Sequence, residues 1–274
     1  MSEQILINGE PGAHLPVSDR GLAFGDGLFE TILLRAGRPF LLEAHLERLA
    51  LGLQKLHISL EINTITSDLE KLFSLFNPHD AVLKILCTRG QGGRGYRPSA
   101  GLVPTRILSL HPPPPTLPAA GIKAFLCRQT LAPQAALAGL KHLNRLEQVL
   151  ASQEWPDDSF HEGLMLTAAG DAIEGTRSNL LLAHKGHWLT PDLRHCGIAG
   201  VLRQHLLRRW GERLQVRPVT LDEVFAAEEL CFCNSVAGVM PVRLLRDYAG
   251  QERAYAKGAL CAAAQSVVQE LLGA

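Results

Sequence analysis

The stretch Leu140–Val149, with the sequence LKHLNRLEQV, contains a lysine in unusual surroundings. Lys141 lies among mostly apolar residues between Leu137 and Leu143. Such surroundings favour the uncharged amine of a lysine side chain, which is its nucleophilic form. A lysine beside a helix start is more often a solvated surface residue, so the stretch alone identifies no site. It makes Lys141 a candidate nucleophile.

A second segment, IEGTRSN at residues 173–179, supplies a carboxylate. Glu174 comes at the end of an expected strand, and Gly175 lets the backbone turn tightly after it. A glutamate at a strand end is commonly a surface residue. A lysine and a carboxylate from separate segments are nevertheless what a pyridoxal phosphate (PLP) enzyme requires, because the amine condenses with the cofactor aldehyde and the carboxylate pairs with the pyridinium nitrogen. Lys141 and Glu174 are therefore predicted to hold PLP.

Three further segments offer groups for a phosphate. Cys196–Arg203 has two glycines just before an expected helix, where N–H groups and the positive end of the helix dipole favour an anion. Asn234 and Ser235 follow an expected strand and add polar donors, and Arg48 could add a charge-assisted bond. Each signal is weak alone, since many helices begin after glycine and most helical arginines are solvated.

Composition narrows the possible partners. The 274 residues contain 27 Lys plus Arg and 27 Asp plus Glu, so the formal net charge is zero and no general field attracts nucleic acid or an anionic membrane. No apolar stretch is long enough to span a bilayer, and the N-terminus lacks the features of a signal peptide. The six cysteines have no metal-ligand spacing. We therefore expect a cytoplasmic protein with no nucleic-acid or membrane partner and no metal.

The proline-rich stretch HPPPPTLP, beginning at His111, divides the sequence. Four consecutive prolines cannot continue a helix or donate to a sheet, and they favour a stiff extended connector. We interpret residues 112–121 as a linker between an N-terminal domain, 1–111, and a C-terminal domain, 122–274. A long surface loop within one domain is the alternative.

Hydrophobic periodicity predicts helices and strands in both parts. Leucines at helical spacing predict amphipathic helices around 42–56 and 143–154, the second with Leu143, Leu146 and Leu150 on one face. Further helices are expected at about 63–76 and 253–272. Short apolar runs bounded by turn residues predict strands between them. The expected fold class is α+β.

The run RGQGGRGY, residues 89–96, matches the GxGxxG spacing of dinucleotide-binding loops. No helix clearly follows it, so that interpretation is poor. We expect instead a mobile lip over a pocket, in which Arg94 and Tyr96 meet substrate carboxylates and Arg106 on the following strand points the same way. A plain exposed basic loop is the alternative.

Together these segments resemble the fold type IV PLP-dependent enzymes, the group of branched-chain and D-amino acid aminotransferases. The similar segments are DRGLAFGDGLFET at 19–31, HLERL at 45–49, Lys141, Glu174–Asn179, Gly197–Gly200 and Asn234–Ser235. They follow one another through nearly the whole chain. The resemblance implies a homodimer, with PLP in the cleft between an N-terminal α/β domain and a C-terminal barrel-like domain.

The resemblance also implies roles for individual residues. Lys141 would be joined to the cofactor, and Glu174 would be the partner of its pyridine nitrogen. The other implied cofactor ligands, most of them around the phosphate, are Arg48, Asn179, Ile198, Ala199, Asn234 and Ser235. Arg177 departs from the group, which usually has smaller residues there, and this leaves the roles of Thr176 and Ser178 open.

Within the group, the chain most resembles the lyases that convert 4-amino-4-deoxychorismate to 4-aminobenzoate and pyruvate in folate biosynthesis. The similar segments are KHLNRLEQ at 141–148, the 89–96 run and TRILS at 105–109. This implies that Lys141 removes the proton from the amine-bearing carbon, after which the enolpyruvyl group leaves and the ring becomes aromatic. A D- or branched-chain amino acid aminotransferase on the same fold is one alternative. A non-catalytic PLP carrier is another.

Overall fold

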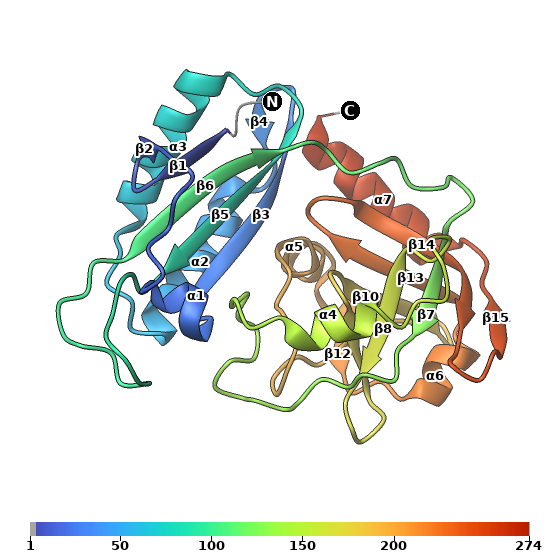
Figure 1. The fold of residues 1–274 in the computed structure, drawn as a ribbon. Coiled ribbons are helices and arrows are strands. Elements are labelled where there is room, and N and C mark those ends of the chain that lie inside the picture. Colours follow the sequence, from blue (N-terminus) through green and yellow to red (C-terminus); the bar gives the residue numbers. More distant parts are fainter. Residues whose placement is uncertain (1–3, 274) are drawn as a thin grey trace. The chain divides into compact units, whose positions relative to one another are not determined.

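The computed structural model describes residues 4–273, which fall into two compact units (Figure 1). The first unit holds the chain up to Pro114 together with Leu140–Asn144, and the second holds Pro115–Gly139 and the chain from Arg145 onward. Both units combine helices with β-sheet, which confirms the α+β class. The segment Leu140–Asn144, which the sequence-based boundaries assign to the C-terminal domain, packs with the first unit.

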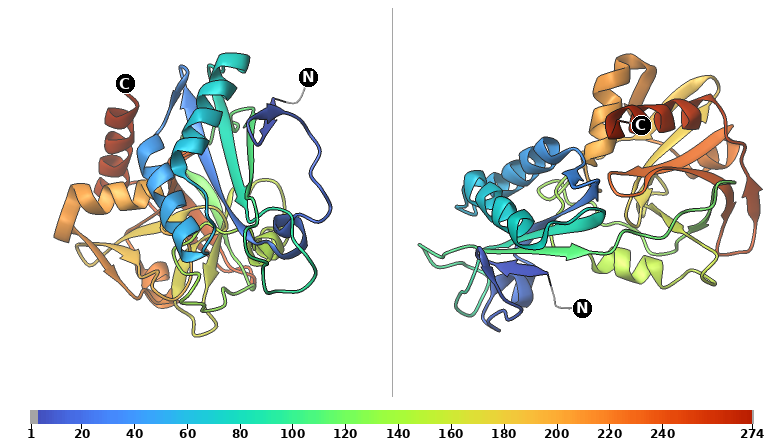
Figure 2. Two further views of the ribbon diagram at one scale, coloured as in Figure 1. Left: turned by 90° about the vertical axis from the view of Figure 1, so that its left-hand side faces the viewer. Right: turned by 90° about the horizontal axis from the view of Figure 1, so that it is seen from above.

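The first unit is a six-stranded antiparallel sheet with two long helices on one face (Figure 2). Its strands are β1 (Ile5–Ile7), β2 (Glu10–Pro11), β3 (Gly27–Arg35), β4 (Arg38–Pro39), β5 (Ala81–Thr88) and β6 (Thr105–His111), in the order β2-β1-β6-β5-β3-β4. Its helices are α1 (Arg20–Phe24), α2 (Leu42–Lys55) and α3 (Ile62–Phe76). The helices expected around 42–56 and 63–76 are thus confirmed.

Helical spacing explains why α2 and α3 cover the sheet. Leu49 and Leu53 of α2, and Leu69 and Leu72 of α3, recur at intervals of three or four residues and are buried. Alternate residues of β3 point to the same side, among them the fully buried Ile32. Each such side chain stabilises the fold by about 1.5–3 kcal/mol.

The segment Leu140–Asn144 lies along the first residues of β3. Phe29 N donates to Lys141 O at 2.9 Å, and Leu143 N donates to Gly27 O at 3.0 Å. β4 pairs only with the other end of β3, so this segment occupies the part of the edge that β4 leaves. The backbone around Lys141 is therefore extended and held by the sheet.

The second unit is built around a closed ring of six strands. These are β7 (Ile122–Leu126), β8 (Glu162–Leu166), β9 (Ala172–Gly175), β10 (Asn179–His184), β13 (Glu229–Asn234) and β14 (Gly238–Arg246). They pair in the order β10-β13-β14-β7-β8-β9, and β9 pairs back to β10 through Glu174 and Asn179. The expected barrel-like fold is confirmed, and two of the predicted site residues close the ring.

Further elements surround this ring. They are α4 (Leu146–Ser152), β11 (His187–Pro191), α5 (Val201–Trp210), the 3-10 helix η1 (Gly211–Arg213), β12 (Leu214–Arg217), α6 (Leu221–Ala226), β15 (Glu252–Ala254) and α7 (Ala259–Leu272). The core includes Leu126, Leu164, Leu180, Phe232 and Val242. None of the helices within residues 4–273 is long and apolar enough to cross a membrane.

Two helices begin later than expected. The helix expected at 143–154 is α4, which begins at Leu146 because the residues before it pair with β3. Leu146 and Leu150, expected on one face with Leu143, are 75% and 51% exposed, and α4 buries Gln148 and Ala151 instead. Similarly, α7 begins after residue 253 because β15 pairs with β14.

Candidate active site

Lys141 lies beside an aromatic ring in the first unit. Its Nζ is 4.2 Å from the centroid of the Phe29 ring, which is the geometry of a cation–π contact. Lys84 of β5 approaches the same ring, with its Nζ 5.7 Å from the centroid. Backbone pairing and the ring together define the position of the Lys141 amine. Two lysine side chains thus approach one aromatic ring.

Arg48 belongs to a buried cluster with Glu30 and His45. Arg48 Nε donates to Glu30 Oε1 at 2.8 Å, and His45 Nδ1 lies 2.6 Å from Glu30 Oε2. Glu30 comes from β3, whereas His45 and Arg48 are three residues apart on one face of α2. All three side chains are largely removed from solvent. The cluster fixes the orientation of the Arg48 guanidinium.

The charges of this cluster follow from its contacts. Burial raises the pKa of Glu30, but Arg48 and His45 more than offset this effect and lower the pKa to about 2. Burial lowers the pKa of His45, and the neighbouring Glu30 opposes this only in part. At neutral pH the cluster is therefore an ionised Glu30–Arg48 pair beside an uncharged histidine.

Replacing Glu30 by glutamine is expected to lower the free energy of unfolding at neutral pH by about 3 kcal/mol, because a largely buried arginine loses its counterion. The folded pKa of Glu30 lies below the ordinary value of 4.5 for a glutamate, so the stabilisation is complete above that pH and is lost as the pH falls toward 2. Urea unfolding of both proteins across this window measures the effect. A difference in stability that stays constant down to the lowest pH would contradict the assignment.

In the second unit, Glu174 and Asn179 are buried where β9 and β10 close the ring. Glu174 Oε2 accepts a hydrogen bond from Ile198 N at 2.8 Å and one from Asn179 Nδ2 at 3.4 Å. Asn179 Nδ2 also donates to Ile198 O at 2.8 Å. The segment before α5 thus fixes the position of the Glu174 carboxylate. A carboxylate that pairs with a single ring nitrogen of a cofactor must be held in place in this way.

Two glycines let that segment approach these side chains. A Cβ on Gly200 would lie 1.9 Å from Asn179 Oδ1, and Gly197 has a φ of +82°, which other residues rarely adopt. Gly200 is the residue before α5 and has no side chain to cap the helix, so no side chain of its own competes with an anion for the N–H groups of the first turn.

The predicted phosphate ligands of this loop have partners within the unit. Ile198 N donates to Glu174, and Ala199 N donates to Gly139 O at 3.1 Å. Sequence reasoning assigned both N–H groups to a phosphate. Their contact with a phosphate stays a prediction.

Asn234 organises the turn between β13 and β14. Its Oδ1 accepts from Val236 N at 2.9 Å and Ala237 N at 2.7 Å, and its Nδ2 donates to Arg177 O at 3.3 Å. The amide expected to contact a phosphate thus bonds to backbone groups. Its neighbour Ser235 is buried. The Ser235 hydroxyl was predicted, together with the Asn234 amide, to contact a phosphate.

The groups present fit PLP in their chemistry. The first unit supplies the Lys141 amine and an oriented guanidinium at Arg48. The second supplies the fixed carboxylate of Glu174 and the start of α5 beyond Gly200. These are the kinds of group that bind the aldehyde, the phosphate and the ring nitrogen of the cofactor.

The glycine-rich run is tethered to α1. Arg20 Nη1 donates to Gly95 O at 3.0 Å, and Arg20 Nη2 donates to Tyr96 O at 2.8 Å. The ring of Tyr96 lies 5.6 Å from that of Phe24, centroid to centroid, yet Tyr96 is 87% exposed. Arg94 is exposed as well. Both predicted substrate contacts therefore lie at the surface of an anchored loop.

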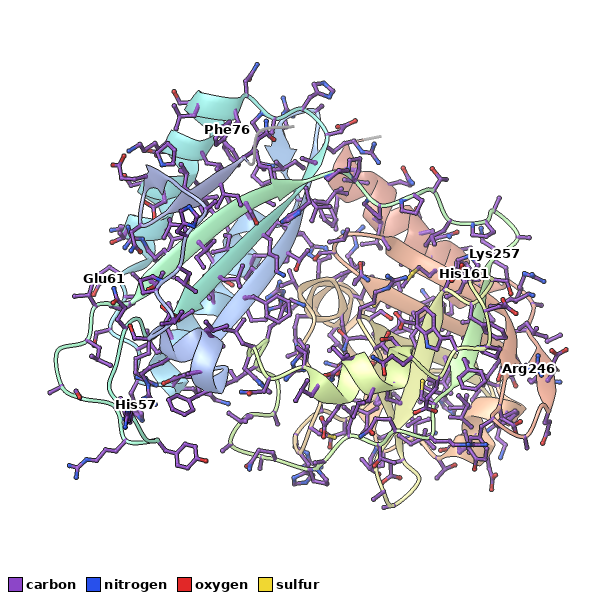
Figure 3. All side chains as sticks on the ribbon, viewed as in Figure 1. His57, Glu61, Phe76, His161, Arg246 and Lys257 are labelled. Atoms are coloured by element: carbon purple, nitrogen blue, oxygen red, sulfur yellow. The ribbon has the colours of Figure 1, made fainter. Side chains whose placement is uncertain are left out.

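Arg89 of this run and Arg106 on the following strand form ion pairs. Arg89 Nε donates to Asp26 Oδ2 at 2.8 Å, and its Nη1 donates at 2.8 Å to the carbonyl of His57, labelled in Figure 3. Arg106 Nε donates to Asp68 Oδ2 at 2.6 Å. Because Asp68 belongs to α3, this contact puts Arg106 on the helix-covered face of the sheet. This contact does not match the expected direction of Arg106 toward a substrate carboxylate.

Sequence reasoning missed Glu30, His45 and Lys84. A weak signal existed for each. Glu30 and Lys84 are charged residues inside otherwise apolar strands, and His45 lies three residues before Arg48 on the same helix. A charge in a buried strand needs a partner, which the pattern cannot name.

The sequence matches the aminotransferase class IV family over residues 27–245. It is 36% identical to the aminodeoxychorismate lyase of Vibrio harveyi over 242 residues, which cover 86% of this chain and 89% of that protein. It is 28% identical to the D-alanine aminotransferase of Bacillus licheniformis, with 87% of each chain covered. The crystal structure of 4-amino-4-deoxychorismate lyase from Pseudomonas aeruginosa superposes with a TM-score of 0.89 at 45% identity, over 97% of this chain and 98% of that one. The chain belongs to the aminotransferase class IV family.

Proposed function

We propose that the protein is a PLP-dependent lyase that converts 4-amino-4-deoxychorismate to 4-aminobenzoate and pyruvate. The proposal rests on one observation: two aminodeoxychorismate lyases are similar to this chain along nearly its whole length, at 36% and 45% identity. The chemistry of Lys141, Arg48 and Glu174 supports the cofactor.

Each of these residues has a proposed part in binding PLP. Lys141 joins the cofactor through its Nζ. Glu174 pairs with the pyridine nitrogen and keeps a proton there. Arg48, the start of α5 and Ser235 bind the phosphate, while Asn179 holds Glu174 in place. When bound, PLP supplies an electron-accepting ring that stabilises negative charge at the amine-bearing carbon of a substrate.

The proposed reaction needs one proton transfer by the protein. Lys141 Nζ takes the proton from the amine-bearing carbon. The enolpyruvyl group on the neighbouring carbon then leaves with the electron pair of its C–O bond, and the remaining ring becomes aromatic. The released enolpyruvate takes up one proton at its methylene carbon to become pyruvate, which balances the proton that Lys141 removed. The substrate carries two carboxylates, for which Lys84, Arg94 and Tyr96 are the proposed partners. Lys84 is included because it shares the Phe29 ring with Lys141.

The purified protein incubated with PLP and then with 4-amino-4-deoxychorismate tests the proposal. An absorption band near the visible edge, followed by release of 4-aminobenzoate and pyruvate in equal amounts, is the expected result. A protein that forms no such band binds no PLP and would be neither enzyme. A band without either product would refute the lyase.

An aminotransferase is the second candidate, favoured by the similarity to a D-alanine aminotransferase over 87% of the chain. Both activities use the same cofactor groups, so Lys141 cannot separate them. Incubation with an amino acid and a 2-oxo acid can. Transfer of the amino group without formation of 4-aminobenzoate would support the aminotransferase instead.

We further propose that the protein is a cytoplasmic homodimer. The six cysteines are free and buried, as suits a reducing compartment. On α4, Leu146, Val149 and Leu150 form an exposed apolar face. Contiguous apolar surface of this kind commonly marks a protein interface.

Replacing Leu150 by glutamate is expected to convert the dimer to a monomer, because a charge would be buried in the interface. Light scattering after size-exclusion chromatography measures the mass, which should fall from twice the chain mass of 29.8 kDa to that of a single chain. Leu75→Glu, at another exposed leucine on α3, is the control and should leave the mass unchanged. A wild-type protein with the mass of one chain would refute the homodimer.

A further inference from the structure

The second unit contains a buried carboxylate to which the proposed function gives no task. Glu162, at the start of β8, is fully buried. It accepts hydrogen bonds from Gly163 N at 2.9 Å, Thr176 N at 2.9 Å and Thr176 Oγ1 at 2.6 Å, and a fourth from Ser178 Oγ. Burial raises the pKa of Glu162, while these donors favour its ionised form. Four donors that converge on one inaccessible carboxylate indicate that Glu162 holds the residues that supply them in place.

The loop that Glu162 holds connects the two strands of the site. Residues 176–178 link β9 to β10, and Gly175 N donates to Ser178 O at 2.6 Å across the loop. The flanking residues Glu174 and Asn179 are the pair that closes the ring. A shift of this loop would therefore move both the carboxylate and the amide that supports it.

Gly175 permits this close approach. A Cβ at this position would lie 2.7 Å from Glu162 Cδ and 2.6 Å from Ser178 Oγ, distances that real Cβ atoms do not show. Successive residues of a strand point to opposite faces, so Gly175 puts the Glu162 carboxyl on the side opposite the Glu174 side chain. Glu162 thus supports Glu174 from behind the strand.

Arg177, the residue that departs from the related enzymes, does not disturb this arrangement. Its side chain is 60% exposed, its Nε lies 3.9 Å from Glu162 Oε2, and its Nη2 donates at 2.7 Å to the carbonyl of His161, labelled in Figure 3. The inward-facing hydroxyls are those of Thr176 and Ser178. The bulky charge is tolerated because the side chain is largely exposed and its guanidinium pairs with the Glu162 carboxylate. Thr176 and Ser178, whose roles were open, donate hydrogen bonds to Glu162.

We propose that Glu162 is a positioning residue, which acts through Thr176 and Ser178 to hold Glu174 and Asn179 in the geometry that the pyridine nitrogen of PLP requires. This inference rests on the proposed function. Partners behind a ligand commonly matter almost as much as the ligand itself, since a displacement of about 1 Å is enough to weaken a site.

Glu162→Gln is the central test, made in the full-length protein loaded with PLP. The variant keeps the shape of the side chain but directs an amide NH₂ at groups that donate. PLP binding should weaken by about tenfold or more, as for other outer partners. In PLP labelled with ¹⁵N at the ring, the nitrogen resonance should move toward that of the unprotonated ring. This second readout reports the Glu174 contact itself.

Glu229→Gln is the matched control. Glu229 is also buried in the second unit and accepts three backbone hydrogen bonds, from Gly258 N at 2.9 Å and from Leu260 N and Cys261 N at 3.0 Å each, at the start of α7. Its loss should reduce stability without moving the ¹⁵N resonance.

The outcomes separate this inference from the proposed function. Wild-type protein that binds no PLP would refute the proposed function, and a Glu174→Gln variant with an unchanged ¹⁵N resonance would refute the cofactor contact proposed for Glu174. If those two behave as expected, a Glu162→Gln variant with wild-type affinity and resonance overturns the positioning role, as does an equal shift in Glu229→Gln. Should Glu162→Gln not fold, Thr176→Val and Ser178→Ala each remove one hydroxyl. Both variants must shift the resonance in the same direction as Glu162→Gln is expected to. If either variant leaves the resonance unchanged, the proposal is overturned.

Discussion

Replacing Lys141 by alanine is expected to reduce turnover of 4-amino-4-deoxychorismate by about a thousandfold, because the variant loses the group that takes the proton. It also loses the amine that condenses with the cofactor, so the absorption band near the visible edge should disappear. Product formation and the spectrum measure the two losses separately. Near wild-type turnover by Lys141→Ala would refute the assignment.

Two other lysines provide controls for this experiment. Lys71 pairs with Glu10 at the surface, and Lys71→Ala should keep both the band and the rate. Lys84 approaches the same Phe29 ring as Lys141, so Lys84→Gln tests whether any ammonium group at that ring suffices. It should keep the band and raise the KM by about tenfold, as loss of one charge-assisted hydrogen bond does.

Borohydride reduction of the PLP-loaded protein adds a direct chemical test. Reduction fixes the cofactor to the lysine that holds it, and peptide mapping should find the label on Lys141. The label should remain there in Lys71→Ala and Lys84→Gln. A label on another lysine would contradict the proposal whatever the rates.

The hydrophobic periodicity of the sequence predicted the helices that pack with one face against a sheet. α2 and α3 follow from leucines and isoleucines at helical spacing, since one face of each helix must be buried. The same argument was wrong about the start of α4. The stretch from Leu140 pairs with β3, and a pairing between segments so far apart in the sequence leaves no mark in local spacing. Leu146, Val149 and Leu150 of α4 are exposed in one chain, so their spacing did not indicate the core of this unit.

In the candidate site, too, some features could be predicted from the sequence and others could not. Lys141 and Glu174 could be selected from the sequence because their residue types and their surroundings match a chemical requirement. Their immediate partners could not. Phe29 meets Lys141 only through the pairing of two distant segments, and Glu174 meets Ile198 only because the loop before α5 folds over the end of β9. Contacts of this kind depend on tertiary structure, which local pattern does not encode.

Arg106 illustrates why direction is harder to predict than position. Its strand was expected, and β6 (Thr105–His111) is present. Alternation along a strand shows which residues share a face, but it does not say which face carries the helices. The contact with Asp68 on α3 shows that Arg106 lies on the face that carries the helices, since the Asp68 carboxylate binds its guanidinium.

Replacing Glu174 by glutamine is expected to lower kcat/KM by about a hundredfold or more, because the variant removes an oriented negative charge. That charge acts through the cofactor ring, which stabilises the negative charge that develops at the amine-bearing carbon of the substrate. The amide keeps the size of the side chain and can still accept the hydrogen bond from Ile198 N, so the loop before α5 should stay in place. An uncharged partner no longer holds a proton on the pyridine nitrogen, and the ring then accepts electrons less well.

The measurements must separate binding from chemistry. Glu174→Gln should still form the absorption band, since Lys141 is intact, while its single-turnover rate falls with kcat. Glu174→Asp keeps the charge but shortens the side chain, so it should recover part of the rate and the protonated ring nitrogen. If the glutamine variant were as fast as wild type, the proton on the ring nitrogen would have to be held by another residue. If the aspartate variant were no better than glutamine, the position of the carboxylate, fixed by Ile198 and Asn179, would matter as much as its charge.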